Sequence, residues 1–152
     1  SLKNNYTSLY DPMKLGMSLF YYSFKWISNI VWTASYAVND VRLRTTNITL
    51  TDIRNEKASH YLYLDHAGWH CLYFLSNEAI LNKLRSFAHT EFDKPKFTNP
   101  DHIEYCRKNG KDIYGRPDHD FSAYHGENGY PVCKECMKLP NYHLFDIPEN
   151  FT

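Results

Sequence analysis

The sequence predicts a mixed α/β domain with flanking helices and a long irregular C-terminal arm. Two observations predict the domain: apolar, aromatic runs of strand character come first, and patterns with helical periodicity follow them. The arm is predicted by the glycines and prolines that recur beyond Gly110, as is typical of loops. The chain has 152 residues, enough for one hydrophobic core, so we expect residues 1–152 to form a single domain.

The predicted strands are rich in aromatic and β-branched residues. "LGMSLFYYSFKW" at Leu15–Trp26 has no helical periodicity, which favours a central strand buried on both faces. "IVWTASYAV" at Ile30–Val38 predicts a second strand that pairs nearby. Tyr61–Leu64 predicts a third, which leads directly into "DHAGWHCLYF". The polar segment Val41–Ser59 predicts neither helix nor strand clearly.

Two helices are predicted after these strands. Asn77–Thr90 is amphipathic, and the residues on its apolar face are Ile80, Leu84 and Phe87. "PDHIEYCRKNG" predicts a shorter helix, which Pro100 precedes and Gly110 stops. The strands predicted above are too few to flank a buried central strand on both sides. We therefore expect the chain to be part of a larger domain.

Charge and composition narrow the function. Lysine plus arginine and aspartate plus glutamate each number 17, so we expect no nonspecific binding to nucleic acid or anionic lipid. The 13 tyrosines, 9 phenylalanines and 3 tryptophans suit either a thick core or a groove that stacks on sugars. No apolar run reaches the length of about 18 residues that a membrane span needs, and no signal-peptide pattern begins the chain, so we expect it to be soluble as it stands. The scattered cysteines leave the compartment open.

Three segments together resemble a known enzyme family. "LGMSLFYYSFKW", "AGWHCLYFLSNEAILNKLRSFAHTEFD" and "IEYCRKNGKDIYGR" resemble, in this order, the C-terminal part of glycosyltransferase family 17, the β-1,4-mannosyl-glycoprotein β-1,4-N-acetylglucosaminyltransferases. The resemblance spans about Met13–Arg116, with a weaker echo at "LPNYHLFDIPENF". It implies a GT-A-like mixed sheet, a UDP-GlcNAc donor, a glycan acceptor and a divalent metal, usually manganese.

The resemblance also implies which half of the enzyme this chain represents. In the family, a D-x-D motif upstream of the matched region holds the metal that neutralises the diphosphate leaving group. We therefore expect this chain to be the acceptor-side part, with the donor and metal half on an N-terminal segment or a second chain. On this view the chain alone does not transfer N-acetylglucosamine (GlcNAc).

Two carboxylates are candidates for the catalytic base. Inverting transfer needs a carboxylate that takes the proton of the acceptor hydroxyl while this hydroxyl attacks the anomeric carbon. Asp65 is expected at the end of an apolar strand, where α/β domains open their sites. Glu78 is expected in the first turn of a helix, where the dipole stabilises the anion. Equally, Asp65 fits a plain turn residue and Glu78 a helix-start carboxylate.

The substrate-binding candidates surround these two carboxylates in the sequence. The Trp69 indole suits stacking on a sugar, and Gly68 would let a ring approach the backbone. His70 suits a hydrogen bond to a hydroxyl or phosphate, or a place in the core. Lys83 and His89 on the predicted helix are further candidates for substrate contacts, although lysines at such positions are more often solvated.

The metal candidates lie further along the chain. Asp118-His119-Asp120 is a literal D-x-D, but it does not follow an apolar strand, so we expect it to be an exposed turn or a minor metal or diphosphate contact through His119 or His125. Separately, the C-x-x-C pair Cys133 and Cys136, with His125 and His143, suits a small zinc site, a disulfide or free thiols.

The resemblance therefore implies an inverting glycosyltransferase that transfers GlcNAc from UDP-GlcNAc to a glycan. The alternatives are a non-catalytic glycan-binding or structural relative, or a small zinc-binding module at the C-terminus.

Overall fold

The computed structural model describes residues 11–56, 60–86, 94–117, 119 and 121–126. Their contacts form two compact units. Unit 1 comprises the described residues up to Ser18 together with Ile30–His70, and unit 2 comprises Leu19–Asn29 together with those from Cys71 onward. None of the helices in these ranges has the length and apolar character that crossing a bilayer requires.

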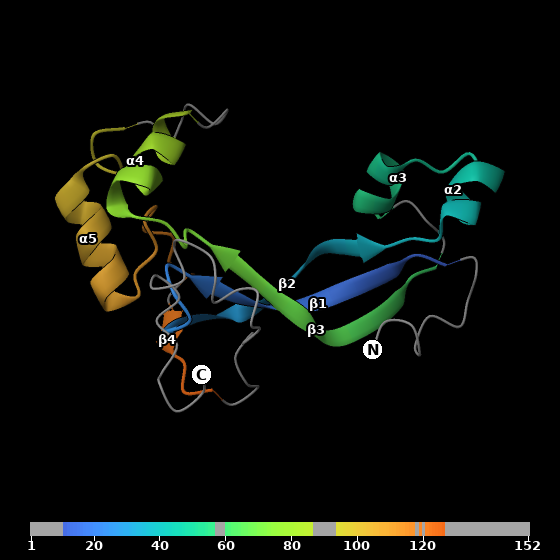
Figure 1. Cartoon of the computed structure of the whole chain (residues 1–152), viewed down its shortest axis with the longest axis horizontal. Coiled ribbons are helices and arrows are strands. Elements are labelled where there is room, and N and C mark those ends of the chain that lie inside the picture. The colour runs from blue at the N-terminus through green and yellow to red at the C-terminus, as the bar shows by residue number, and fades with distance from the viewer. Residues whose placement is uncertain (1–10, 57–59, 87–93, 118, 120, 127–152) are drawn as a thin grey trace, which may run out of the picture. The chain divides into compact units, whose positions relative to one another are not determined.

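The framework is a four-stranded mixed sheet with the strand order β3-β1-β2-β4 (Figure 1). Its strands are β1 (Met13–Tyr21), β2 (Trp26–Ala37), β3 (Leu62–Leu72) and β4 (Phe121–Ala123). β4 pairs antiparallel with β2. The mixed α/β fold class is therefore confirmed, and β1 occupies the predicted interior position of the sheet.

β1 and β3 run parallel to one another (Figure 1). The N–H of Leu62 donates to the carbonyl of Pro12 at 2.9 Å where both strands begin. The N–H of Tyr22 donates to the carbonyl of Leu72 at 2.9 Å where both strands end. Because the two bonds keep the same offset along both strands, the carboxyl ends of β1 and β3 lie side by side.

The first predicted strand is too long. β1 ends at Tyr21, and Trp26 already belongs to β2. Tyr22 has a positive φ of 67°, and the hydroxyl of Ser23 accepts from the N–H of Lys25, so the chain turns here without glycine or proline. Burial on both faces is also wrong for the first part of β1, since full burial is continuous only over its last three residues, Leu19–Tyr21.

The other strand predictions differ from the structure mainly in their boundaries. β2 is a strand where Ile30–Val38 predicts one, but it begins at Trp26. β3 starts at Leu62 and continues to Leu72, so the predicted third strand and the following "DHAGWHC" form one element. The predicted irregular region beyond Gly110 contains the short strand β4.

The ambiguous segment of unit 1 forms two short helices, α2 (Asp40–Thr45) and α3 (Leu50–Arg54). Each begins at a polar cap: the Asn39 side chain accepts from the N–H of Val41, and Thr49 and Asp52 form a capping box. α3 buries only Ile53. Because polar caps rather than an apolar face define these helices, hydrophobic periodicity does not reveal them.

Both predicted helices of unit 2 are confirmed. α4 (Asn77–Ser86) buries Ile80 and Leu84, and the predicted end of this helix, with Phe87, lies outside the described residues. α5 (Pro100–Asn109) stops at Gly110, which has a left-handed φ of 60°. The two helices lie side by side (Figure 1).

Aromatic side chains form the core of unit 2. The cluster consists of Phe20, Phe24, Phe74 and Tyr124, all at most 7% exposed. Phe20 meets Phe24 and Tyr124 edge-to-face, with ring centroids 5.0 and 4.9 Å apart. The high aromatic content of the chain therefore serves the core in this unit.

Candidate functional site

The predicted site residues belong to two different units. Asp65, Gly68, Trp69 and His70 lie on β3 within unit 1. Glu78 and Lys83 lie on α4 within unit 2, where Glu78 is exposed in the first helical turn. His89 lies outside the described residues.

Trp69 presents its indole to solvent on an edge strand. The residue is 39% exposed, and its indole makes no hydrogen bond or ring contact with any described residue. The other two tryptophans do have partners: the Nε1–H of Trp26 donates to the carbonyl of Arg107 at 2.8 Å, and Trp32 stacks on His70. Within the described chain, Trp69 is thus the tryptophan available to a ligand.

His70 packs within unit 1. Its imidazole stacks on the indole of Trp32, with ring centroids 4.2 Å apart and planes 8° from parallel. The ring is only partly accessible, because His70 is half-buried. This stacking fixes the orientation of the His70 imidazole. His70 therefore has a structural role whether or not a substrate contacts it.

Gly68 is required by the backbone. Its φ is +154°, a value that residues with a side chain rarely adopt, and a Cβ there would lie 3.3 Å from Cε of Met17. The backbone conformation within unit 1 therefore explains why residue 68 is glycine. This reason is independent of the close approach of a ligand ring that the sequence suggests.

Asp65 does not end a strand, contrary to the sequence-based expectation, because β3 continues through it to Leu72. Its side chain is 58% exposed. Oδ1 accepts from the N–H of His66 at 2.9 Å and from the Tyr63 hydroxyl at 3.4 Å. The missing side chain of Gly16 on β1 leaves room for Tyr63, whose hydroxyl would lie 2.2 Å from a Cβ there. Asp65 is therefore an oriented, solvent-accessible carboxylate on a strand face.

The described residues do not fit a manganese site. They contain no group of three or more His, Cys, Asp or Glu side chains that could hold a metal ion. His119 and His125 are described, but Asp118 and Asp120 lie outside the described residues. The same holds for the C-x-x-C pair Cys133 and Cys136 and for His143, so the zinc hypothesis stays untested.

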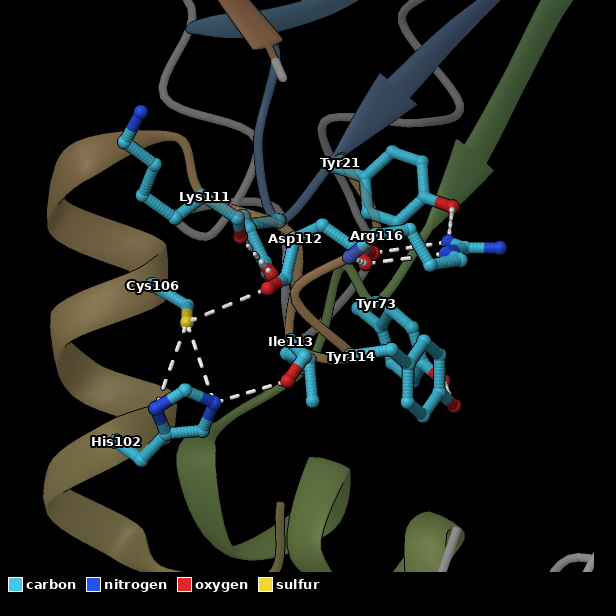
Figure 2. A network of polar contacts seen from close by, with 10 residues as sticks. Tyr21, Tyr73, His102, Cys106, Lys111, Asp112, Ile113, Tyr114 and Arg116 are labelled. Carbon is cyan, nitrogen blue, oxygen red and sulfur yellow. Dashed lines mark hydrogen bonds and ion pairs between the residues drawn. The ribbon is translucent and has the colours of Figure 1, made fainter. Parts of the chain in front are cut away.

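A second cluster lies in unit 2, at the carboxyl ends of β1 and β3. Tyr21 ends β1, Tyr73 follows β3, and the loop after α5 brings Asp112, Tyr114 and Arg116 to them (Figure 2). The carboxyl ends of parallel strands are where open α/β sheets bind ligands. We call these five residues the tyrosine–arginine cluster.

A buried carboxylate holds the arginine of this cluster. Asp112 is 4% exposed, and its Oδ2 accepts from the backbone N–H and the Nε–H of Arg116, both at 3.0 Å. Its Oδ1 accepts from Nη2 at 2.8 Å. These bonds raise the pKa of the guanidinium, so Arg116 is always charged. The side chain of Arg116 nevertheless stays 41% exposed.

The tyrosines surround this guanidinium (Figure 2). Nη2 donates to the hydroxyl of Tyr21 at 3.5 Å, and the guanidinium carbon lies 5.3 Å from the centroid of the Tyr114 ring. The hydroxyls of Tyr114 and Tyr73 are hydrogen-bonded at 2.7 Å. The ammonium of Lys83 lies 4.9 Å from the centroid of the Tyr73 ring. Two cations thus contact the two members of one phenol pair.

Burial keeps two of these phenols neutral. Burial is the largest of the causes that raise the pKa of both Tyr21 and Tyr73 above the ordinary value of 10.0. Neutral phenols can donate a hydrogen bond, whereas phenolates cannot. Near neutral pH the cluster therefore offers hydrogen-bond donors beside two positive charges.

The cysteine beside this loop is not an activated nucleophile. Cys106 Sγ lies 3.6 Å from Nε2 of His102, but the carbonyl of Ile113 lies 2.9 Å from the same nitrogen and can only accept (Figure 2). Nε2 therefore carries a proton and cannot take one from the thiol, while Nδ1 lies 4.0 Å from Sγ and the thiol itself donates to the carbonyl of Asp112 at 3.8 Å. Burial raises the pKa of Cys106 to about 11, so the group stays a thiol at neutral pH. His102 and Cys106 anchor the loop.

The sequence contains weak signals of this cluster. Asp112 and Arg116 stand four residues apart in "KDIYGR", and Tyr21 belongs to "FYYSF". Sequence patterns do not predict that these segments meet. They come together because β1 and β3, which are far apart in the chain, pair in parallel.

Comparison of the chain with models of known protein families, with curated proteins and with solved structures finds no match in any of the three.

Proposed function

We propose that this chain is the acceptor-side part of an inverting glycosyltransferase that transfers GlcNAc from UDP-GlcNAc to a glycan. The observation that carries the proposal is the exposed indole of Trp69 on an edge strand, without a partner among the described residues. An indole face stacks on the C–H face of a sugar ring, and the 39% exposure of Trp69 leaves part of its side chain accessible to a ligand.

β3 also supplies polar groups for a glycan. Asp65 and Tyr63 are exposed on the same strand, and both can form hydrogen bonds with sugar hydroxyls. An apolar ring beside a few oriented polar groups is the usual composition of a small-molecule site. Trp69, Asp65 and Tyr63 form what we call the β3 surface.

The proposed chemistry is a single displacement at the anomeric carbon. The acceptor oxygen forms the new C–O bond while the bond to the UDP oxygen breaks, and the acceptor proton passes to a carboxylate. Asp65 on β3 and Glu78 on α4 are the two candidates for this base. The family resemblance implies manganese at the diphosphate, but the described residues supply no site for it, so no step here depends on a metal.

Non-catalytic glycan binding is the second candidate function. It is favoured by the fact that the β3 surface needs neither a metal nor a base to hold a sugar. The two candidates share the binding step and differ in whether UDP is released.

The test uses the purified chain and an N-glycan core oligosaccharide. Saturation-transfer NMR would measure binding to the chain, to Trp69→Ala and to Tyr105→Ala, which removes an even more exposed aromatic ring from α5. We expect loss of binding with Trp69→Ala only. The absence of glycan binding by the unaltered chain would contradict both functions.

A second measurement separates the two functions. The measurement combines the chain with the donor and metal half that the resemblance implies. Release of UDP from UDP-GlcNAc by this combination in the presence of the glycan supports transfer, whereas glycan binding without UDP release, with or without added manganese, supports the non-catalytic candidate. Asp65→Asn and Glu78→Gln then identify the base. The amide can still form a hydrogen bond with a sugar hydroxyl but cannot take the acceptor proton, so turnover should be lost only in the variant of the catalytic carboxylate.

A further inference from the structure

We propose that Arg116 and Tyr21 form a binding site for a phosphoryl group at the carboxyl ends of β1 and β3. The proposal concerns unit 2 and does not depend on sugar transfer or on the β3 surface. It rests on two hydrogen-bond donors of the tyrosine–arginine cluster, Nη1 of Arg116 and the hydroxyl of Tyr21, that have no acceptor among the described residues.

The guanidinium of Arg116 is held in place, but not all of its N–H donors form hydrogen bonds with described residues. Its Nε and Nη2 donate to the two oxygens of Asp112, and Nη2 also contacts the hydroxyl of Tyr21. Within the described part of the chain, Nη1 makes no hydrogen bond. Figure 2 shows this end of the guanidinium directed away from Asp112. A charged donor is thus held in place without an acceptor among the described residues.

Tyr21 supplies a second donor at the same place. Its oxygen accepts from Nη2 of Arg116, and a nitrogen of a charged guanidinium can only donate, so the phenol proton points elsewhere. The described residues offer no acceptor for that proton. The phenol ring is fixed by stacking on Phe121, with ring centroids 4.1 Å apart. Nη1 and the phenol O–H are therefore two positioned donors, the first on a side chain that is 41% exposed and the second on a tyrosine that is only 6% exposed.

The geometry favours phosphoryl over carboxylate. A carboxylate is planar and binds an arginine best through two parallel hydrogen bonds. Asp112 already takes that arrangement on the Nε and Nη2 edge, and Tyr21 occupies the Nη2 side of the other edge. What remains are single donors in different directions, which match the tetrahedrally arranged oxygens of a phosphoryl group.

The local charge agrees with an anionic ligand. Asp112 offsets the charge of Arg116, but the ammonium of Lys83 adds a second positive charge over Tyr73, whose hydroxyl is bonded to Tyr114. Because the whole chain has no formal net charge, attraction must come from this local surplus. Binding should therefore weaken as salt is added.

The experiment titrates the purified chain with inorganic phosphate and, in parallel, with sodium acetate at matched ionic strength. NMR would follow the side-chain Nε–H signal of Arg116. We expect a saturable shift with phosphate and none with acetate. Equal affinity for acetate, or no saturable shift with phosphate at the highest soluble concentration, would overturn the proposal.

Variants show which donors carry the binding. Tyr21→Phe removes only the hydroxyl and keeps the stacked ring, so the fold should persist while phosphate affinity falls about three- to tenfold. Arg116→Lys keeps a charge but loses the fixed Nη1 donor, and it should weaken binding further. Arg85→Gln removes an exposed charge from α4 in the same unit and is the matched control.

Two outcomes with these variants count against the site. Unchanged phosphate affinity in folded Tyr21→Phe would remove the phenol from it. A loss in Arg85→Gln as large as that in Arg116→Lys would reduce the effect to nonspecific charge attraction. Backbone amide spectra of each variant confirm that it is folded before its affinity is interpreted.

Discussion

The indole of Trp26 lies so close to Gly110 that a Cβ at this glycine would come within 2.5 Å of Cε3 of Trp26. Gly110 ends α5 in the left-handed conformation, and the Nε1–H of the same indole donates to the carbonyl of Arg107 in the last turn of that helix. One tryptophan of β2 thus covers the end of α5. This contact fixes where the loop of the tyrosine–arginine cluster begins.

Gly110→Ala should therefore destabilise unit 2. The left-handed φ is unfavourable for alanine, and the new methyl group collides with a packed ring, which together cost about 2 to 4 kcal/mol of the free energy of unfolding. Urea unfolding measures this loss. Gly115→Ala is the matched control, because its φ is also positive, at 66°, but a Cβ there meets nothing within 4 Å. Equal losses in both variants would mean that the Trp26 contact contributes nothing.

Trp69→Ala should weaken glycan binding without unfolding the protein. We expect a loss of about 1 to 3 kcal/mol of binding free energy, the scale known for bases that stack on aromatic side chains. Thermal stability should change little, because the indole is exposed and has no ring partner among the described residues. Calorimetric titration and a melting curve on the same sample check both. A large drop in melting temperature with unaltered binding would instead make Trp69 a packing residue.

Stability should fall between about pH 9 and pH 11, partly because of Cys106. Burial raises the pKa of this thiol from 9.0 to about 11 in the folded protein. The folded state therefore holds its proton more tightly than the unfolded state does. The resulting stabilisation is complete below pH 9 and is lost as the pH rises through the folded value.

Urea unfolding at pH 8 and near pH 10.5, on the unaltered chain and on Cys106→Ala, isolates this contribution. We expect a smaller loss of stability with rising pH in the variant, because the buried tyrosines still titrate but the thiol is absent. An identical pH dependence in both proteins would show that Cys106 ionises alike in the folded and unfolded states.

The bond between the hydroxyls of Tyr73 and Tyr114 should be measurable as a coupling energy. Tyr73→Phe and Tyr114→Phe each remove one partner of a 2.7 Å hydrogen bond while keeping the rings. In a double-mutant cycle based on unfolding free energies, we expect a coupling of about 0.5 to 1.5 kcal/mol. Additive effects of the two substitutions would show that the bond contributes no stability.

The sequence predicts the parts of the fold that short-range patterns determine. α5 follows from Pro100 at its start and Gly110 at its end, and α4 from the spacing of Ile80 and Leu84. The turn after Tyr21 was not predicted, because a tyrosine rather than a glycine takes the positive φ there. The strand-end position expected for Asp65 was wrong, since β3 accommodates Gly68 without ending.

The candidate sites differ in how far the sequence reveals them. Trp69 and Asp65 are neighbours in the chain, so a single stretch of sequence predicts the β3 surface. The tyrosine–arginine cluster requires Tyr21, Tyr73 and Arg116 to meet, and no local pattern encodes the register that brings them together. The backbone hydrogen bond from Tyr22 to Leu72 holds β1 and β3 together beside the cluster, and the hydroxyl of Tyr22 donates to the carbonyl of Lys111 at 2.7 Å, which brings in the loop after α5.

The parallel pairing of β1 with β3 also sets the order in which the sheet forms. β1 and β2 are joined by a short turn, so this hairpin can form within microseconds. β3 reaches β1 only after the chain between Tyr22 and Leu72 has closed as a loop, which has a larger entropic cost and makes the step slower.

We therefore expect an early species that contains the hairpin but lacks β3, so that the surface around Arg116 is complete only in the final phase of refolding. Pulsed hydrogen exchange during refolding tests this order. The amides of Leu62 and Tyr22, which bond across β1 and β3, should gain protection after those between β1 and β2. Simultaneous protection would mean that the sheet forms in one cooperative step.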